Sequence, residues 1–222
     1  MKAFYFAKID YIKARTQLYV LLVITAVVVV IMQMSKDMTG QAGFMYGVFL
    51  AIVFSTTPFG NCTRKDVGFQ QLLPATTLQR VMGRFVYGLS MLFIGIGIGL
   101  VAAAGYSILT GQRETIPLPL CLIIFAVGLI LITVQYIFFY LVGESKGAQF
   151  LSLVRMVPGM CFFFGSIKLT GEIQKDPSGA AKIIEMIGGN IDSIGWGSVA
   201  LAVLVMAGGI LVCTRATMKK DY

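Results

Sequence analysis

The chain has 222 residues, of which 57% are hydrophobic and only 13% are charged, and its mean hydropathy is +0.85. A soluble domain has no room for this much apolar surface, since soluble chains are on average about 25% charged. The net charge of +8 would suit a nucleic-acid partner, but the basic residues fall mainly on one side of the apolar stretches, so no nucleic-acid partner is expected. The composition therefore predicts an integral membrane protein.

Six long apolar stretches follow one another along the chain. Each is long enough for a helix to cross a hydrocarbon core about 30 Å thick, which takes roughly 20 residues. The stretch that contains Arg155 is the least regular of the six. The prediction is an all-α, polytopic protein in which residues 1–222 form a single transmembrane domain, with spans at residues 16–34, 41–59, 81–109, 118–142, 150–167 and 195–213.

The two sides of these predicted spans differ in positive charge. With the N-terminus inside, thirteen Lys and Arg residues fall on the inner side and five on the outer side. Because inner segments retain the positive charge, this bias predicts that both termini are cytoplasmic. No small-x-small cleavage site follows the first span and five more spans come after it, so we interpret it as a retained helix and not as a signal peptide.

Two amphipathic helices are predicted outside the spans. In residues 1–15 an apolar stripe at helical spacing predicts a helix in the inner membrane interface, with a mere topology-setting basic tail as the alternative. Before the last span, Asp176-Pro177 resembles a helix start and Gly188-Gly189 a helix stop, which predicts a short outer amphipathic helix. The N-terminal stripe consists of Phe4, Ala7, Tyr11 and Ala14.

Glycines at four-residue spacing occur in the second and third spans. Small residues let helix backbones approach closely where lipid supplies no hydrophobic drive between helices. Ordinary packing within the chain is expected in preference to a dimer seam or a gate. The residues are Gly43 and Gly47 in the second span, and Gly95, Gly97 and Gly99 in the third.

Most membrane-embedded chemistry is excluded by residues that the chain lacks. It has no histidine, and the predicted spans contain no acid, so zinc sites of the HExxH kind, intramembrane aspartyl proteases and carboxylate proton relays lack their working groups. We expect no enzyme activity, no metal site and no cofactor in this chain. Arg84 and Arg155 stand about one turn inside the inner boundary, where a long side chain can reach the headgroups, and this is expected in preference to substrate binding. Pro158 could still open a polar notch near Arg155.

The inner loop between the second and third spans, residues 60–80, mixes charges with apolar anchors. Phe69, Leu72 and Leu73 can line one side of a short helix, which Pro74 would stop. Thr76 or Thr77 can cap the helix that follows. This arrangement suits docking into a groove on a soluble partner, whereas the alternative is a loop that turns its apolar side to the membrane.

At this loop the chain resembles ABC-2 type transporter permeases. Residues 70–85, Gln-Gln-Leu-Leu-Pro-Ala-Thr-Thr-Leu-Gln-Arg-Val-Met-Gly-Arg-Phe, are similar to the family's Leu-Pro signature, which continues through a small polar pair and a basic residue into the next span. The layout is most similar to the small branch that includes exporters of phenol-soluble modulins and antimicrobial peptides. Gly143-Glu-Ser-Lys-Gly147 resembles the family's second inner loop. One departure is Arg64-Lys65 before Asp66, where relatives often carry several acids.

The resemblance implies an ABC-2 (type V) exporter-like fold with short cytoplasmic coupling helices. It implies a separate ATPase subunit that binds ATP and Mg, because the chain has no GxxxxGK[ST] loop, and a second permease subunit, identical or similar. The implied substrate is a hydrophobic or amphipathic one, such as a peptide, exported across a bacterial cell membrane. The implied docking residues are Asp66, Phe69, Gln70, Leu72, Leu73, Pro74, Arg80, Glu144 and Lys146, and those of a cavity or of coupling are Arg84, Arg155, Tyr136 and Phe163.

Two other classes of function remain as alternatives. A secondary carrier or channel for a small solute or ion would need no ATPase, but the spans lack carboxylates and clear broken helices in matching halves. A membrane anchor or sensor subunit would position a partner without transport, although the short outer loops argue against sensing outside.

Overall fold

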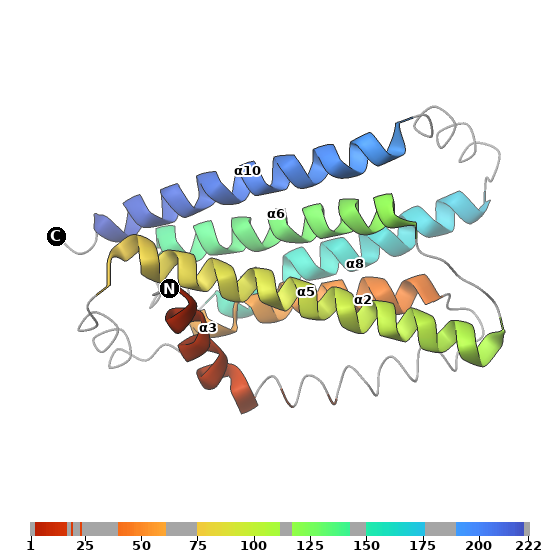
Figure 1. The fold of residues 1–222 in the computed structure, drawn as a ribbon, viewed down its shortest axis with the longest axis horizontal. Helices are drawn as coiled ribbons and strands as arrows, with labels where there is room; N and C mark the ends of the chain where they lie inside the picture. The colour runs from red at the N-terminus through yellow and green to blue at the C-terminus, as the bar shows by residue number, and fades with distance from the viewer. Residues whose placement is uncertain are drawn as a thin grey trace.

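A computed structural model describes residues 3–16, 19, 23, 40–60, 75–111, 117–142, 150–175 and 190–219, and in these ranges the regular structure is entirely helical. Residues 3–16 form an N-terminal helix. The helices that follow, labelled in Figure 1, are α2 (Gly40–Ser55), α3 (Thr57–Gly60), α5 (Thr77–Thr110), α6 (Leu118–Val142), α8 (Leu151–Lys175) and α10 (Ile191–Met218).

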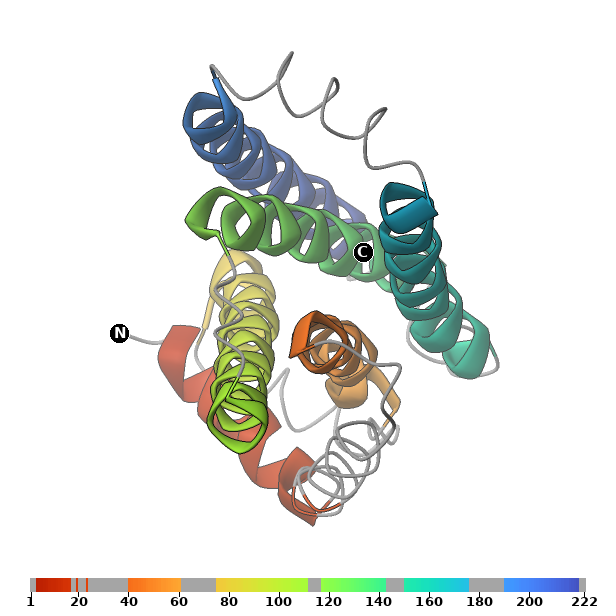
Figure 2. The same ribbon diagram turned by 90° about the vertical axis from the view of Figure 1, so that its right-hand side faces the viewer.

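The long helices lie side by side as a bundle (Figures 1 and 2). Helix α5 packs mainly against α2, α6 packs mainly against α10, and α8 packs along α2. The N-terminal helix crosses the bundle near the start of α5. We call this end, where α5 begins, α6 and α10 end and α2 passes into α3, the α3 end of the bundle.

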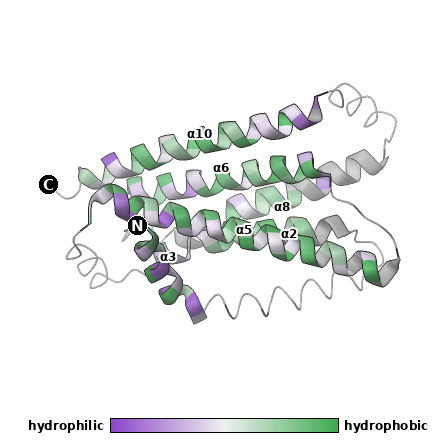
Figure 3. Ribbon diagram, viewed as in Figure 1, coloured by the Kyte–Doolittle hydropathy of each residue, from purple (hydrophilic) through white to green (hydrophobic). Residues whose placement is uncertain are grey.

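Apolar residues extend along most of the helix lengths, while polar residues are more frequent near the ends and on the N-terminal helix (Figure 3). Three helical segments of the described chain are long and apolar enough to cross a membrane, namely Thr77–Gly105, Leu118–Val142 and Asp192–Met218. Two shorter apolar helices are Phe44–Phe59 and Leu153–Gly165. The chain is therefore a multi-pass, all-helical membrane protein; the predicted total of six spans stays a prediction, because the span at 16–34 lies almost wholly outside the described residues.

The helix bounds differ from the predicted spans mainly at the ends. Helix α6 has the bounds of the predicted fourth span, whereas α8 continues past residue 167 to Lys175, and α10 begins at Ile191, before residue 195. Where the second span was expected to be continuous, α2 ends at Ser55 and Thr56 forms a turn before α3. The predicted outer helix at 176–189 lies outside the described residues.

Helix α5 begins where the sequence predicted a cap. The Thr76 hydroxyl accepts the N–H of Gln79 at 3.3 Å, and the Gln79 side chain accepts the N–H of Thr76 at 3.3 Å. This reciprocal capping box satisfies two of the N–H groups that a helix start leaves without partners, and of the two predicted candidates, Thr76 and Thr77, the cap is Thr76. At the other end, Gly111 closes the helix at a φ of 70°, a left-handed conformation that glycine adopts without strain.

Glycines bring α2 and α5 into backbone contact. A Cβ added to Gly95 would lie 2.5 Å from the carbonyl oxygen of Gly47, and one added to Gly99 would lie 2.8 Å from the Cα of Phe44. The prediction of ordinary packing within the chain is confirmed for Gly47, Gly95 and Gly99. A Cβ on Gly97 would meet nothing within 4 Å, so this glycine has no part in the contact.

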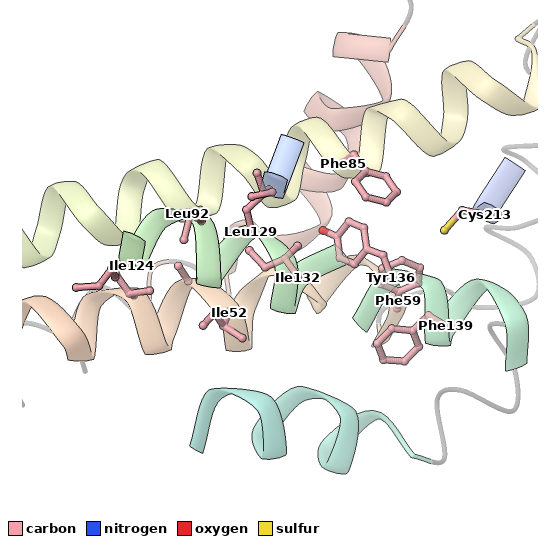
Figure 4. Packing of buried hydrophobic residues seen from close by; sticks show 14 of the residues in the cluster. Ile52, Phe59, Phe85, Leu92, Ile124, Leu129, Ile132, Tyr136, Phe139 and Cys213 are labelled. Atoms are coloured by element: carbon pink, nitrogen blue, oxygen red, sulfur yellow. The ribbon is translucent and has the colours of Figure 1, made fainter. Parts of the chain in front are cut away.

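The core changes from aliphatic to aromatic toward the α3 end (Figure 4). Ile52, Leu92 and Ile132 fill the middle of the α2, α5 and α6 interface. Nearer to α3, the Phe59 ring stacks on Phe139 at a centroid distance of 4.6 Å and meets the Tyr136 ring edge-on at 5.1 Å. Aromatic rings therefore surround the break between α2 and α3, and they shield its polar groups from lipid.

Candidate functional site

The break between α2 and α3 frees a backbone carbonyl in the interior of the bundle. In a regular α-helix the N–H of Phe59 would bond the carbonyl of Ser55, but here it donates to the carbonyl of Thr56 at 3.1 Å. The hydroxyl of Tyr136 on α6 donates to the Ser55 carbonyl oxygen at 2.7 Å. Because a buried carbonyl without a donor is costly where no water is present, Tyr136 stabilises the break.

A second freed carbonyl lies in α8. Pro158 stands inside this helix and has no N–H, so the carbonyl of Val154, four residues earlier, loses its helical donor. The side-chain nitrogen Nε2 of Gln135, also on α6, donates to the Val154 oxygen at 2.9 Å. The polar notch that the sequence suggested near Pro158 is therefore filled by an amide from another helix.

The two breaks are connected through their side chains. The Ser55 hydroxyl donates to the Ile52 carbonyl at 2.8 Å and lies 3.4 Å from Oε1 of Gln135. The Arg155 Nε donates to the Thr56 hydroxyl at 3.1 Å and thus joins α8 directly to the turn after α2. We call Ser55, Thr56, Gln135, Tyr136 and Arg155 the polar cluster; it links α2, α6 and α8 near the α3 end.

Arg84 was expected to extend to the headgroups, but its side chain lies in the protein interior. Its side chain is only 5% exposed, and its guanidinium carbon lies 4.5 Å from the ring centroid of Phe59 and 5.8 Å from that of Tyr140. Aromatic faces attract a cation and replace part of its hydration, so the rings stabilise the buried charge. The sequence of its own span offers Arg84 no charged partner, whereas rings from α3 and α6 lie beside it in the folded chain. Arg155, half-buried, bonds Thr56 and likewise has a protein partner.

An acid also enters the bundle, which the sequence analysis did not foresee. Asp10 of the N-terminal helix is 3% exposed, and its charge interacts with Tyr87 and Tyr136. Arg84 interacts electrostatically with Tyr136 as well. The predicted spans themselves contain no acid, as the sequence shows, and this buried carboxylate comes from the N-terminal helix, outside those spans.

The N-terminal helix is present, but its packed face is rotated from the predicted stripe. Phe4 is 69% exposed, while Phe6 and Ala7 are buried against α5, where a Cβ on Gly83 would lie 2.5 Å from the Cβ of Phe6. Tyr11 donates to the Ser90 hydroxyl at 2.5 Å, and its ring meets that of Tyr87 at 4.9 Å. The interior face therefore includes Phe6, Ala7, Asp10, Tyr11 and Ala14.

Of the other predicted site residues, Arg80 and Phe163 are described and lie apart from the polar cluster. Arg80 is in the first turn of α5 and donates to the Ala75 carbonyl at 3.4 Å. Phe163 packs against Tyr46 and Phe49 of α2, at centroid distances of 6.1 and 5.7 Å. The predicted docking residues Asp66, Phe69, Gln70, Leu72, Leu73, Pro74, Glu144 and Lys146 lie outside the described residues.

Sequence signals existed for the cluster residues that the analysis missed. Gln135 carries the only amide in the apolar run from Leu118 to Val142. The hydroxyl residues Ser55, Thr56 and Thr57 directly precede Pro58. A lone amide in one span and a hydroxyl run before a proline in another are typical of buried helix breaks with side-chain hydrogen bonds.

Taken together, the apolar helices and the polar groups buried between them define a polytopic, helical membrane protein. The family described as ABC-2 family transporter protein matches residues 8–217, so the chain belongs to this family. It is thus a permease, the membrane component of an ABC transporter, and its family acts in transport and not in catalysis. Comparison with curated proteins and with solved structures found no match.

Proposed function

We propose that this permease exports a hydrophobic or amphipathic substrate, such as a peptide, from a bacterial cell, and that a separate cytoplasmic ATPase drives it. The ATPase would bind ATP and Mg and dock on the loop from Asp66 to Arg80 and on residues 143–147. A second permease subunit, identical or similar, would complete the translocation path. The small family branch named above is the subtype that this proposal favours.

The positions of the helix ends support the docking hypothesis. Helix α3 ends at Gly60 and α5 begins at Thr77, on either side of the first predicted docking loop. Helix α6 ends at Val142 and α8 begins at Leu151, on either side of the second. All four helix ends are directed to the α3 end of the bundle (Figure 1). One soluble partner at this end could therefore contact both loops.

The aromatic residues between α2 and α8 support an apolar substrate. Tyr46, Phe49 and Phe163 contact one another and are only partly buried, while Phe164 is exposed. Such rings provide apolar area and favourable contacts with other apolar or cationic groups. A path along this face would suit a substrate with one apolar side, and Arg155 lies on the same helix nearer the α3 end.

The proposed docking is tested with Phe69→Ala/Leu72→Ala. This double variant should lower co-purification of the ATPase and substrate-stimulated ATP hydrolysis, because it removes the two apolar anchors of the loop. A matched control is Phe93→Ala/Leu100→Ala, which removes the same residue types from the exposed surface in the middle of α5. Equal ATPase recovery with both variants would contradict docking at this loop. Export that proceeds equally without any ATPase would indicate a secondary carrier or channel instead.

A further inference from the structure

We propose that Gln135 and Tyr136 are positioning residues that couple the α2 break to α8 at the carbonyl that Pro158 frees, so that displacement of one moves the other. Their effect on transport rests on the proposed function, since α3 leads directly into the predicted docking loop. Neither residue needs to touch substrate or ATPase. They act through the two freed carbonyls, of Ser55 and Val154.

The geometry of α6 explains how adjacent residues serve different helices. Successive side chains of an α-helix point about 100° apart, so Gln135 and Tyr136 can face separate neighbours. Gln135 donates to Val154 of α8, and Tyr136 donates to Ser55 of α2. Both side chains are fully buried, and α6 is itself packed along α10. Helix α6 therefore provides a shared support to which both freed carbonyls are bonded.

The hydrogen bonds from Gln135 and Tyr136 to the freed carbonyls also allow the backbone at these carbonyls to move. A carbonyl bonded within a regular helix is fixed by the neighbouring backbone, whereas a carbonyl freed at a break depends on a side chain that can follow it. The Thr56 turn can thus bend while Tyr136 remains its donor. The Arg155 bond to Thr56 and the 3.4 Å approach of Ser55 to Gln135 then transmit the change to α8.

The first experiment tests the geometry by rescue. Gln135→Met removes the amide at similar volume and should lower the apparent Tm of the purified permease by about 2–4 °C. Pro158→Ala supplies a backbone N–H that can bond the Val154 carbonyl within α8. In the Pro158→Ala background, Gln135→Met should therefore lower the Tm by less than half as much.

A matched control accompanies this cycle. Thr133→Val removes a buried hydroxyl of α6 that bonds Leu129 within the same helix, at 2.8 Å. Its effect on the Tm should be the same with Pro158 or with Ala at that position. Equal losses for Gln135→Met in both backgrounds would overturn the assignment of Gln135 to the freed carbonyl.

The second experiment tests the coupling without the ATPase. Tyr136→Phe removes one hydroxyl on the α2 side, and it should increase amide hydrogen exchange in residues 153–157 of α8. Tyr11→Phe is the control, because it also removes one hydroxyl hydrogen bond, to Ser90, but not at either break. Unchanged exchange in α8 with Tyr136→Phe, or equal increases with both variants, would overturn the coupling.

The third measurement is substrate exported per ATP hydrolysed, in vesicles that contain the complete transporter. Gln135→Met and Tyr136→Phe should lower this ratio severalfold, whereas Tyr11→Phe should not. A loss of Tm with an unchanged ratio would mean that the residues are structural only. Absence of ATP-driven export in the wild type would contradict the proposed function, while the exchange experiment would still decide whether the two breaks are coupled.

Discussion

Replacement of Gly95 by Ala should destabilise the permease by separating α2 from α5. The new Cβ would lie 2.5 Å from the Gly47 carbonyl oxygen and 2.6 Å from the Cβ of Ala51. Ordinary van der Waals contact begins near 3.4 Å, so the two helices would have to move apart by about 0.9 Å at this crossing. The oxygen and the carbon of the Gly47 carbonyl, at 2.5 and 3.2 Å, are backbone atoms, and a rotamer change cannot remove them.

The cost can be estimated from core substitutions that add one methyl group. Such overpacking typically costs about 1–3 kcal/mol. For a chain of this length, each kcal/mol corresponds to about 2–4 °C in Tm. Gly95→Ala is thus expected to lower the apparent Tm in detergent by several degrees, measured by loss of monodisperse protein after heating. Addition of Ala51→Gly should recover only part of this loss, because it removes the contact with the Ala51 Cβ and leaves those with the Gly47 carbonyl.

The matched control is Gly97→Ala, two residues further along α5, where a Cβ meets nothing within 4 Å. This substitution should leave the Tm unchanged or raise it slightly, because Ala has the higher helix propensity. If Gly95→Ala and Gly97→Ala give the same Tm, the helices do not approach as closely as described. A dimer seam that contained Gly97 would instead make Gly97→Ala the more damaging of the two.

Three further predictions concern charge and orientation. Arg84→Met should lower the Tm less than Arg84→Glu, because the rings around Arg84 accept an apolar side chain but repel an anion; equal losses would argue against the cation–ring contact. Arg155→Lys should reduce ATP-driven transport more than substrate binding, because Lys has no Nε–H to hold the Thr56 hydroxyl, and normal transport would assign Arg155 another role. Single cysteines at Ser178 and Thr217 in a cysteine-free background should react with an impermeant thiol reagent from outside and inside respectively, and the reverse pattern would invert the topology.

The structural features that depend on short sequence patterns could be predicted from the sequence. The apolar run that became α6 needed only its length and composition, and the cap at Thr76 or Thr77 needed only a hydroxyl residue just before the next apolar run. The glycine contact followed from small residues at four-residue spacing. In the first two cases one short segment contains the whole pattern, and in the third each of the two helices contains its own part of it.

Features that depend on contacts between distant segments were missed. Arg84 was expected at the headgroups because its own span gives it no partner, yet Phe59 and Tyr140 come from other helices. Asp10 was overlooked because it precedes the first span, and only the packing of residues 3–16 on α5 buries it. The hydroxyl run before Pro58 is a local signal for the break at Thr56, but it does not show which groups complete the hydrogen bonds there. Its polar groups find their partners 81 and 99 residues further along the chain.

These long separations have a consequence for biogenesis. Ser55 receives its donor only after Tyr136 has been synthesised, and Thr56 waits for Arg155. At roughly 5–20 residues per second, ribosomes take about 4–20 s to make those 80–100 residues. During that interval the α2 break must remain near water or within the insertion machinery, because lipid offers no donor to its carbonyl. Chains that stop before α6 should accordingly be degraded, and mature permease should accumulate only once α6 and α8 have entered the membrane.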